Sequence, residues 1–245
     1  MTRYNFLNTN VDNFSMKETL AKIENTIDNK KQLLHVGVNA SHIVALQNDQ
    51  ELKKCINEAD IINVDGQAVV WASKILNQPL KERVSGIDLM VNLVELAYKK
   101  DYKIFFFGAK EEVVKTVVDV YTDKYSSNII AGYRNGYFKK DEEQNIAREI
   151  SNSGANMLFV GISSPIKENF LFENRDILKQ VNLIMGVGGS FDVVSGKVKR
   201  APKWMQNCGL EWFYRFLQEP KRMWKRYLVG NTKFIILVLK ERFLK

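Results

Sequence analysis

The sequence predicts an α/β fold: a Rossmann-like, mainly parallel sheet with helices on both faces, followed by a C-terminal helical appendage. From about residue 15 to residue 195, short continuous apolar runs alternate with segments of helical periodicity. This alternation is typical of parallel strands that are covered on both faces. After Gly196 the pattern becomes purely helical, with breaks expected at Pro220 and Gly230. We therefore divide the chain into an α/β domain, 1–195, and a basic, aromatic appendage, 196–245.

Each expected element has a local signal. Ser15 followed by Glu18 is a capping box, which begins a helix that continues through Ile27. The apolar runs predict strands at LLHVGV (33–38), IINV (61–64), KIFFFGA (103–109), NIIAGY (128–133), NMLFVG (156–161) and NLIMGVGG (182–189). Helical spacing predicts helices over 43–56, 85–100, 113–125 and near 142–150.

Composition excludes several classes of protein. With 45% hydrophobic and 26% charged residues over 245 positions, the chain is globular. Two cysteines are too few for a disulfide framework and indicate a reducing compartment. The N-terminus has no apolar signal core, so secretion is not expected. The aliphatic run FIILVL (234–239) is far short of the ~20 residues that span a bilayer.

Charge is distributed unevenly along the chain. Residues 196–245 contain 13 Lys and Arg against 3 Asp and Glu, a net charge of +10, whereas residues 1–195 have a net charge of −2. The appendage is therefore the part expected to meet an anionic surface.

Polar residues follow two of the expected strands directly. In parallel α/β sheets, ligands bind at the carboxyl ends of the strands, where this chain places Asn39 and Asp65. A carboxylate there can act as a general base. The local alternatives are a helix cap for Asn39 and a cap or an Asp-Gly turn for Asp65.

The segment GVGGSFDVVSG (186–196) is similar to a dinucleotide-binding loop. The G-x-G-x-x-G fingerprint fails because Phe191 occupies the position of the third glycine, so an NAD-dependent oxidoreductase is disfavoured. Such a loop can still bind a phosphate through its backbone N–H groups, although a tight turn also requires glycine. The sequence has no P-loop and no D-x-D motif, the usual carboxylate site for the metal ion of a nucleotide sugar.

The appendage interleaves aromatic rings with cations in RAPKWMQNCGLEWFYRFLQEPKRMWKRY (200–227). The stripe at Met205, Cys208, Trp212, Phe213, Phe216 and Leu217 has helical spacing, which favours packing against the domain. Rings beside cations also suit a membrane interface or single-stranded nucleic acid. The chemistry alone does not choose among these.

Taken together, the motifs resemble the WecG/TagA/CpsF family of glycosyltransferases, glycosyltransferase family 26. The matching segments occur in the family's order and cover nearly the whole chain: VGVNASH, ADIINVDGQAVVWASK, ERVSGIDLM, FFFGAKEEVV, GYRNGYF, FVGISSPIKENF, GVGGSFDVVSGKVKRAP and LEWFYRFLQEPKRMWKRY. The resemblance is most specific in the last two.

The resemblance implies a bacterial enzyme that transfers N-acetylmannosamine, or a related sugar, from a UDP donor to undecaprenyl-diphosphate-linked N-acetylglucosamine. The transfer would invert the anomeric centre and need no metal or other cofactor. N-acetylmannosaminuronic acid or a hexose is the alternative donor sugar. The implied location is the cytoplasmic face of the plasma membrane, with the appendage docked on an anionic surface. Nucleic acid is not an expected partner, and self-association through exposed rings is a further expectation.

The resemblance also assigns roles to residues. Asp65 and Arg83 are the expected catalytic residues, with Asp65 as the general base. The expected donor- and acceptor-binding residues are Asn39, Gly66, Gly108, Tyr137, Lys167, Glu168, Gly188, Gly189 and Asp192. The appendage residues expected to contact the diphosphate or the membrane are Arg215, Arg222 and Arg226.

Two positions depart from the family pattern. Gly37 stands where members often have a hydroxyl residue, and Lys167 stands where they usually have glutamine. An added cation leaves the identity of the donor sugar open. Because the strand pattern ends at residue 189, we also expect the sheet to persist when everything after Gly196 is removed.

Overall fold

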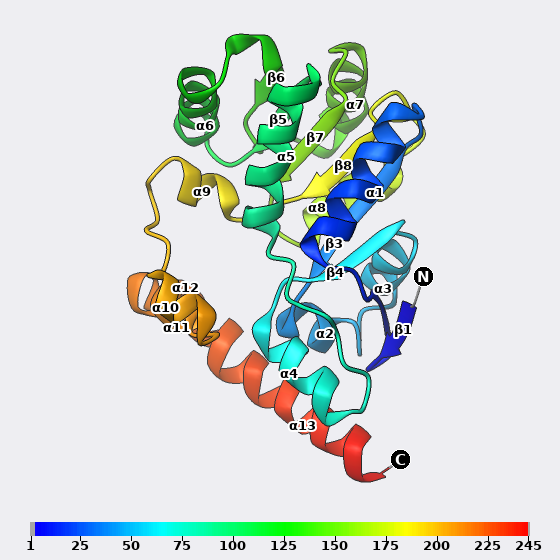
Figure 1. The fold of residues 1–245 in the computed structure, drawn as a ribbon, viewed down its shortest axis with the longest axis vertical. Coiled ribbons are helices and arrows are strands. Elements are labelled where there is room, and N and C mark those ends of the chain that lie inside the picture. The colour runs from blue at the N-terminus through cyan, green and yellow to red at the C-terminus, as the bar shows by residue number, and fades with distance from the viewer. Residues whose placement is uncertain (1–2, 245) are drawn as a thin grey trace.

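The computed structural model describes residues 3–244, without the side chains of residues 225, 226 and 244. Its main sheet has six strands in the order β4-β3-β8-β7-β5-β6, and all neighbouring strands are parallel (Figure 1). The strands are β3 (Leu33–Val38), β4 (Ile61–Val64), β5 (Ile104–Gly108), β6 (Ile130–Arg134), β7 (Met157–Gly161) and β8 (Leu183–Gly186). The predicted α/β class and parallel sheet are confirmed.

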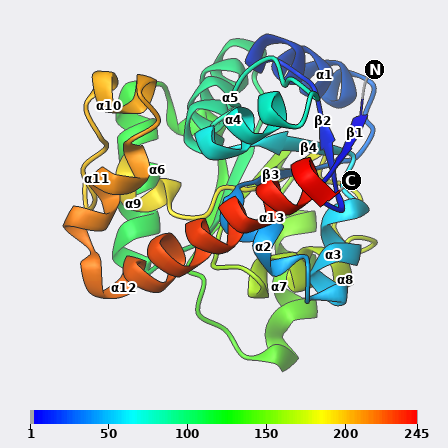
Figure 2. The ribbon, with the colours of Figure 1, turned by 90° about the horizontal axis from the view of Figure 1, so that it is seen from below.

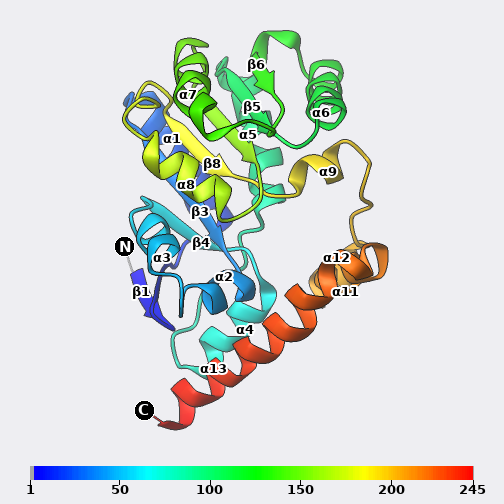
Figure 3. The same ribbon diagram turned by 180° about the vertical axis from the view of Figure 1, so that it is seen from behind.

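Helices cover both faces of this sheet, as Figures 1 and 3 show from opposite sides. One face packs against α1 (Met16–Asp28), α5 (Gly86–Lys100), α6 (Glu111–Lys124) and α9 (Ser190–Val194). The other packs against α2 (Ala40–Ala45), α3 (Gln50–Asn57), α4 (Gln67–Ile75), α7 (Glu143–Asn152) and α8 (Ile166–Glu173). Alternate residues of each strand enter opposite layers, as with Phe105 and Phe106 of β5.

Local signals explain most of the element boundaries. The capping box is confirmed: the Glu18 N–H donates to Ser15 Oγ, and Glu18 Oε2 accepts from the Ser15 N–H. The single helix predicted over 43–56 is wrong, because the Asp49 side chain accepts from the Leu52 N–H at 2.9 Å and begins a second helix. An antiparallel hairpin of β1 (Arg3–Phe6) and β2 (Thr9–Asp12) precedes the sheet, and the sequence analysis did not predict it.

The appendage is mainly helical from residue 203 onward. The predicted break at Pro220 is confirmed, because a new helix begins there, whereas the predicted break at Gly230 is wrong, because the helix continues through that residue from a π-helical segment into α13. Seen from below, α13 crosses from the α10–α12 group towards the hairpin (Figure 2). Its segments are α10 (Lys203–Asn207), α11 (Glu211–Gln218), α12 (Pro220–Trp224), a π-helical segment (Lys225–Val229) and α13 (Gly230–Leu244). No helix among the described residues combines the length and the apolarity needed to span a bilayer.

The appendage shares part of the domain's core. Phe234 and Val238 of α13 are 3% and 5% exposed and belong to the same hydrophobic cluster as residues of α2 and α4. By contrast, none of the eight residues of α11, all of which the structure describes, is buried. The sheet contains no appendage residue, but one of its covering layers does. The domain boundary at residues 195 and 196 stays a prediction.

Candidate active site

Asn39 and Asp65 lie at the carboxyl ends of neighbouring strands. Val38 of β3 is paired with Val64 of β4, and the Asp65 N–H donates to the Val38 carbonyl at 2.8 Å. Asn39 caps α2, since its Oδ1 accepts from two backbone N–H groups at 3.0 and 3.3 Å. With its oxygen used in this way, Asn39 has its amide NH₂ to offer a ligand.

Glycines allow close packing at the carboxyl ends of β3 and β4, a corner of the sheet that holds Asn39 and Asp65. A Cβ on Gly66 would lie 3.2 Å from the Cβ of Asn39, which is tighter than ordinary contact. A Cβ on Gly37 would lie 3.5 Å from the Cβ of Asp65, so the hydroxyl residue that relatives are expected to have at this position fits directly beside Asp65. Gly66 and Gly37 therefore border the two polar side chains.

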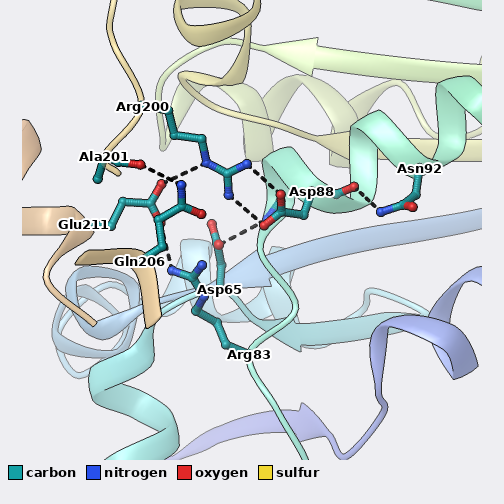
Figure 4. Close-up of polar contacts among 9 residues, drawn as sticks. Asp65, Arg83, Asp88, Asn92, Arg200, Ala201, Gln206 and Glu211 are labelled. Carbon is teal, nitrogen blue, oxygen red and sulfur yellow. Dashed lines mark hydrogen bonds and ion pairs between the residues drawn. The ribbon is translucent and has the colours of Figure 1, made fainter. Parts of the chain in front are cut away.

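The segment that leads into the start of α5 contacts both the end of β4 and the Asp65 carboxylate. The Val84 N–H donates to the Val64 carbonyl at 2.9 Å, so this segment lies along the end of β4. Two residues on, the Gly86 N–H donates to Asp65 Oδ1 at 3.1 Å. Arg83 immediately precedes Val84, so the backbone of Arg83 lies at the same corner. Figure 4 shows the side chains of Asp65 and Arg83. The Asp65 carboxylate and the backbone of Arg83 therefore lie at the same end of β4, and their catalytic roles stay predictions.

Charged groups from the appendage reach this corner. Arg83 Nη1 donates to Glu211 Oε2 at 2.9 Å, and Arg200 donates from both terminal nitrogens to the carboxylate of Asp88 at 2.6 and 2.7 Å. Burial raises the pKa of Asp88, but hydrogen bonding and the positive charge of Arg200 outweigh burial and hold that pKa below its ordinary value. The sequence analysis did not single out Asp88, Arg200 or Glu211 as site residues.

The glycine-rich loop after β8 holds an appendage arginine. Gly188 has a φ of +52°, which favours glycine, and a Cβ on Gly189 would lie 2.6 Å from Nη2 of Arg215. The absent side chain lets the guanidinium lie against the loop backbone. Asp192, in the first turn of α9, pairs with Lys197 at 3.4 Å. Because β8 is paired with β3, this loop and Asn39 lie at neighbouring strand ends.

The parallel neighbours β5 and β7 end at the same edge of the sheet. The chain leaves β5 towards β6 and leaves β7 towards β8, which makes this pair a topological switch point. Gly108 has a φ of +137°, and a Cβ there would lie 2.5 Å from the backbone carbon of Gly161. The Gly136 N–H donates to the Ala109 carbonyl, which places the loop bearing the exposed Tyr137 over the end of β5. Gly108 and Tyr137 therefore lie at the carboxyl edge.

Lys167 and Glu168 occupy a different environment. They are 7% and 4% exposed, and Lys167 Nζ lies 2.9 Å from Glu168 Oε1, beside a cavity of about 10 Å³ with room for a water molecule. Burial raises the pKa of Glu168, but the charge of Lys167 outweighs it and holds that pKa below its ordinary value. Burial also lowers the pKa of neighbouring His35 to about 4, so this imidazole is neutral at pH 7. Contact of the pair with a ligand stays a prediction.

Arg222, another predicted appendage contact, lies at the surface. Arg222 is half-exposed and pairs with Glu219 at 2.6 Å, and Glu219 also lies 3.5 Å from Arg215. The side chain of Arg226 lies outside the described residues. Of the two predicted appendage contacts whose side chains the structure describes, Arg215 is the one that lies against the glycine-rich loop.

A parallel sheet with a carboxylate, an amide and arginines gathered at its carboxyl edge is typical of an α/β enzyme that binds an anionic ligand. The model of the "Glycosyl transferase WecG/TagA/CpsF family" matches residues 4–245, so the chain belongs to this family of glycosyltransferases. The resemblance predicted from the sequence motifs is confirmed.

Two similar proteins carry the name N-acetylglucosaminyldiphosphoundecaprenol N-acetyl-beta-D-mannosaminyltransferase. The one from Bacillus subtilis (strain 168) is 37% identical over 215 residues, which are 88% of this chain and 82% of the relative. The one from Bacillus spizizenii (strain ATCC 23059 / NRRL B-14472 / W23) is 38% identical over 197 residues, which are 80% and 74% of the two chains.

Proposed function

We propose that this enzyme transfers N-acetylmannosamine from a UDP donor to undecaprenyl-diphosphate-linked N-acetylglucosamine, as in wall teichoic acid synthesis. The observation that carries the proposal is the similarity to the Bacillus subtilis relative, which bears this activity in its name and aligns with 88% of the chain. The gathering of Asn39, Asp65 and Arg83 at the carboxyl edge supports it, because a transferase needs a base and positive charge at one place.

The mechanism is a single displacement at the anomeric carbon of the donor. Asp65 takes the proton of the acceptor hydroxyl while the oxygen of that hydroxyl bonds to the anomeric carbon. The bond from this carbon to the UDP oxygen breaks, UDP leaves with the electron pair, and the configuration inverts. The Gly86 N–H, which donates to Oδ1, holds the carboxylate in place. In this mechanism the second oxygen, Oδ2, receives the proton.

The growing charge on the leaving diphosphate requires positive groups. Arg215 lies against the backbone of Gly189, where N–H groups can also meet phosphate oxygens, and Arg83 lies beside the end of β4. These groups are the basis for proposing that no metal is required, in keeping with the absence of a D-x-D motif from the sequence. No three His, Cys, Asp or Glu side chains gather as a metal site within the described part of the chain.

The test of this function is turnover of a defined lipid-linked N-acetylglucosamine acceptor against a panel of UDP sugars. We expect UDP-N-acetylmannosamine to be the best substrate, with activity that persists in a chelator. Preference for UDP-N-acetylmannosaminuronic acid or a UDP-hexose would instead support the alternative donor and contradict the assignment of the sugar. No transfer from any UDP sugar would contradict the proposed reaction.

We propose further that the appendage binds the cytoplasmic face of the plasma membrane. Exposed apolar side chains share this region with exposed cations, as expected of a segment at an anionic bilayer surface. The apolar members are Trp204, Phe213, Leu217, Trp224, Leu228, Val229, Ile235, Ile236, Leu239 and Phe243. The cationic members are Lys203, Lys221, Arg222, Lys233, Lys240 and Arg242.

Vesicle binding tests the membrane surface. Leu239→Glu should weaken binding to phosphatidylglycerol-containing vesicles by roughly tenfold or more, because it removes an inserted apolar side chain and adds repulsion. Val120→Glu, at an exposed position of α6, is the matched control and should bind like wild type. Unchanged binding by Leu239→Glu would contradict the proposal. If that variant instead dissociated an oligomer in sedimentation, the face would be assigned to self-association.

A further inference from the structure

Glu211 uses its two carboxylate oxygens for two different arginines. Oε2 accepts from Arg83 Nη1 at 2.9 Å, and Oε1 lies 3.4 Å from Arg200 Nε (Figure 4). The side chains of Glu211 and Arg83 are 27% and 16% exposed, so the pair is screened less than a surface ion pair. One carboxylate at the start of α11 thus joins the loop before α5 to the part of the appendage that precedes α10.

Arg200, the second partner of Glu211, is also fixed by hydrogen bonds. Arg200 forms the bidentate pair with Asp88 in the first turn of α5, a geometry that restrains the guanidinium plane. The backbone next to Arg200 is held by Gln206, whose side-chain N–H donates to the Ala201 carbonyl at 2.7 Å. Arg200 is therefore held by carboxylates from both the domain and the appendage.

These contacts form a closed ring. Arg83 contacts Glu211, Glu211 contacts Arg200, Arg200 contacts Asp88, and the backbone from Asp88 returns to Arg83. The backbone of that return segment includes Gly86, whose N–H donates to Asp65. The ring contains two positive and two negative side chains, so its charges balance. The segment that orients the proposed base is the same segment that receives the appendage.

We propose that Glu211 is a positioning residue, which orients Arg83 towards the reacting diphosphate and makes its orientation depend on docking of the appendage. This inference rests on the proposed function. A guanidinium has five N–H donors and the bond to Glu211 uses one of them, so Arg83 can be held by Glu211 and still donate to phosphate oxygens. Glu211 itself acts only through Arg83 and Arg200.

Glu211→Gln tests the proposal because it preserves size but removes the charge. We expect kcat to fall by about 10- to 100-fold, the range that follows from small misplacement of a catalytic group, with little change in the KM for the UDP sugar. In an Arg83→Ala background the same substitution should change kcat by less than about twofold, because its effect passes through Arg83.

Glu149→Gln is the matched control. Glu149 of α7 pairs at 3.2 Å with Arg134 of β6, the edge strand opposite β4, and its loss should leave kcat and KM as in wild type. Wild-type kcat in Glu211→Gln would overturn the proposal, as would a loss that multiplies fully with that of Arg83→Ala. An inactive wild type would instead count against the proposed function, so the two failures are distinguishable.

Asp88→Asn covers the case in which Glu211→Gln does not fold. It weakens the Arg200–Asp88 pair and leaves the Arg83–Glu211 contact intact. We expect a smaller fall in kcat that is again largely absent in the Arg83→Ala background. A variant that folds like wild type and keeps full kcat would overturn the coupling between docking and the orientation of Arg83.

Discussion

Asp65→Asn is expected to lower turnover by about 10²–10⁴-fold while the protein stays folded. The amide keeps an oxygen that can accept from the Gly86 N–H, so the local structure is preserved. It cannot take the proton of the acceptor hydroxyl, and this is the physical reason for the loss. Turnover of the lipid-linked acceptor and thermal melting of the same sample measure the two halves of the prediction.

The control is Asp119→Asn, which makes the same chemical change at an exposed position of α6 and should be fully active. Near-normal turnover by folded Asp65→Asn would show that another group is the base. A loss of turnover accompanied by early melting would instead assign Asp65 a role in the fold, as the Asp-Gly turn interpretation predicts.

Phe234→Ala is expected to lower the free energy of unfolding by about 3–5 kcal/mol, the usual cost of emptying a buried phenylalanine site. Phe234 is 3% exposed and packs in the cluster shared by α2, α4 and α13. For a chain of this size, each kcal/mol lowers the melting temperature by about 2–4 °C. Thermal and denaturant unfolding of the purified protein measure the change.

Ile235→Ala is the control on the same helix, since Ile235 is 57% exposed and should change stability by no more than about 0.5 kcal/mol. Equal melting of both variants would show that α13 does not stabilise the domain. The same packing alters our expectation for removal of everything after Gly196. The truncated chain would expose the apolar surface that Phe234 and Val238 cover, so we now expect it to melt early or aggregate.

The sequence by itself determined the class of fold and the position of two polar residues at one edge of the sheet. A strand that is buried on both faces appears in the sequence as a continuous apolar run, and a helix appears as helical periodicity. Because both signals are local, their alternation was sufficient to predict the parallel sheet. Asn39 and Asp65 follow strands that proved to be neighbours, and side chains directly after parallel strands necessarily meet at one edge. The motifs were also sufficient to identify the family.

Only the tertiary structure decided how the appendage contacts this edge of the sheet. The contact of Glu211 with Arg83 joins residues 128 positions apart, and that of Arg200 with Asp88 spans 112. Arg215 of α11 lies against Gly189 of the loop after β8, a contact that no local sequence pattern encodes. The burial of Lys167 beside Glu168 was also not predicted from the sequence, and contact of Lys167 with a ligand stays a prediction. Charge and spacing indicate what a side chain can do, whereas its partner is set by which surfaces the packed helices bring together.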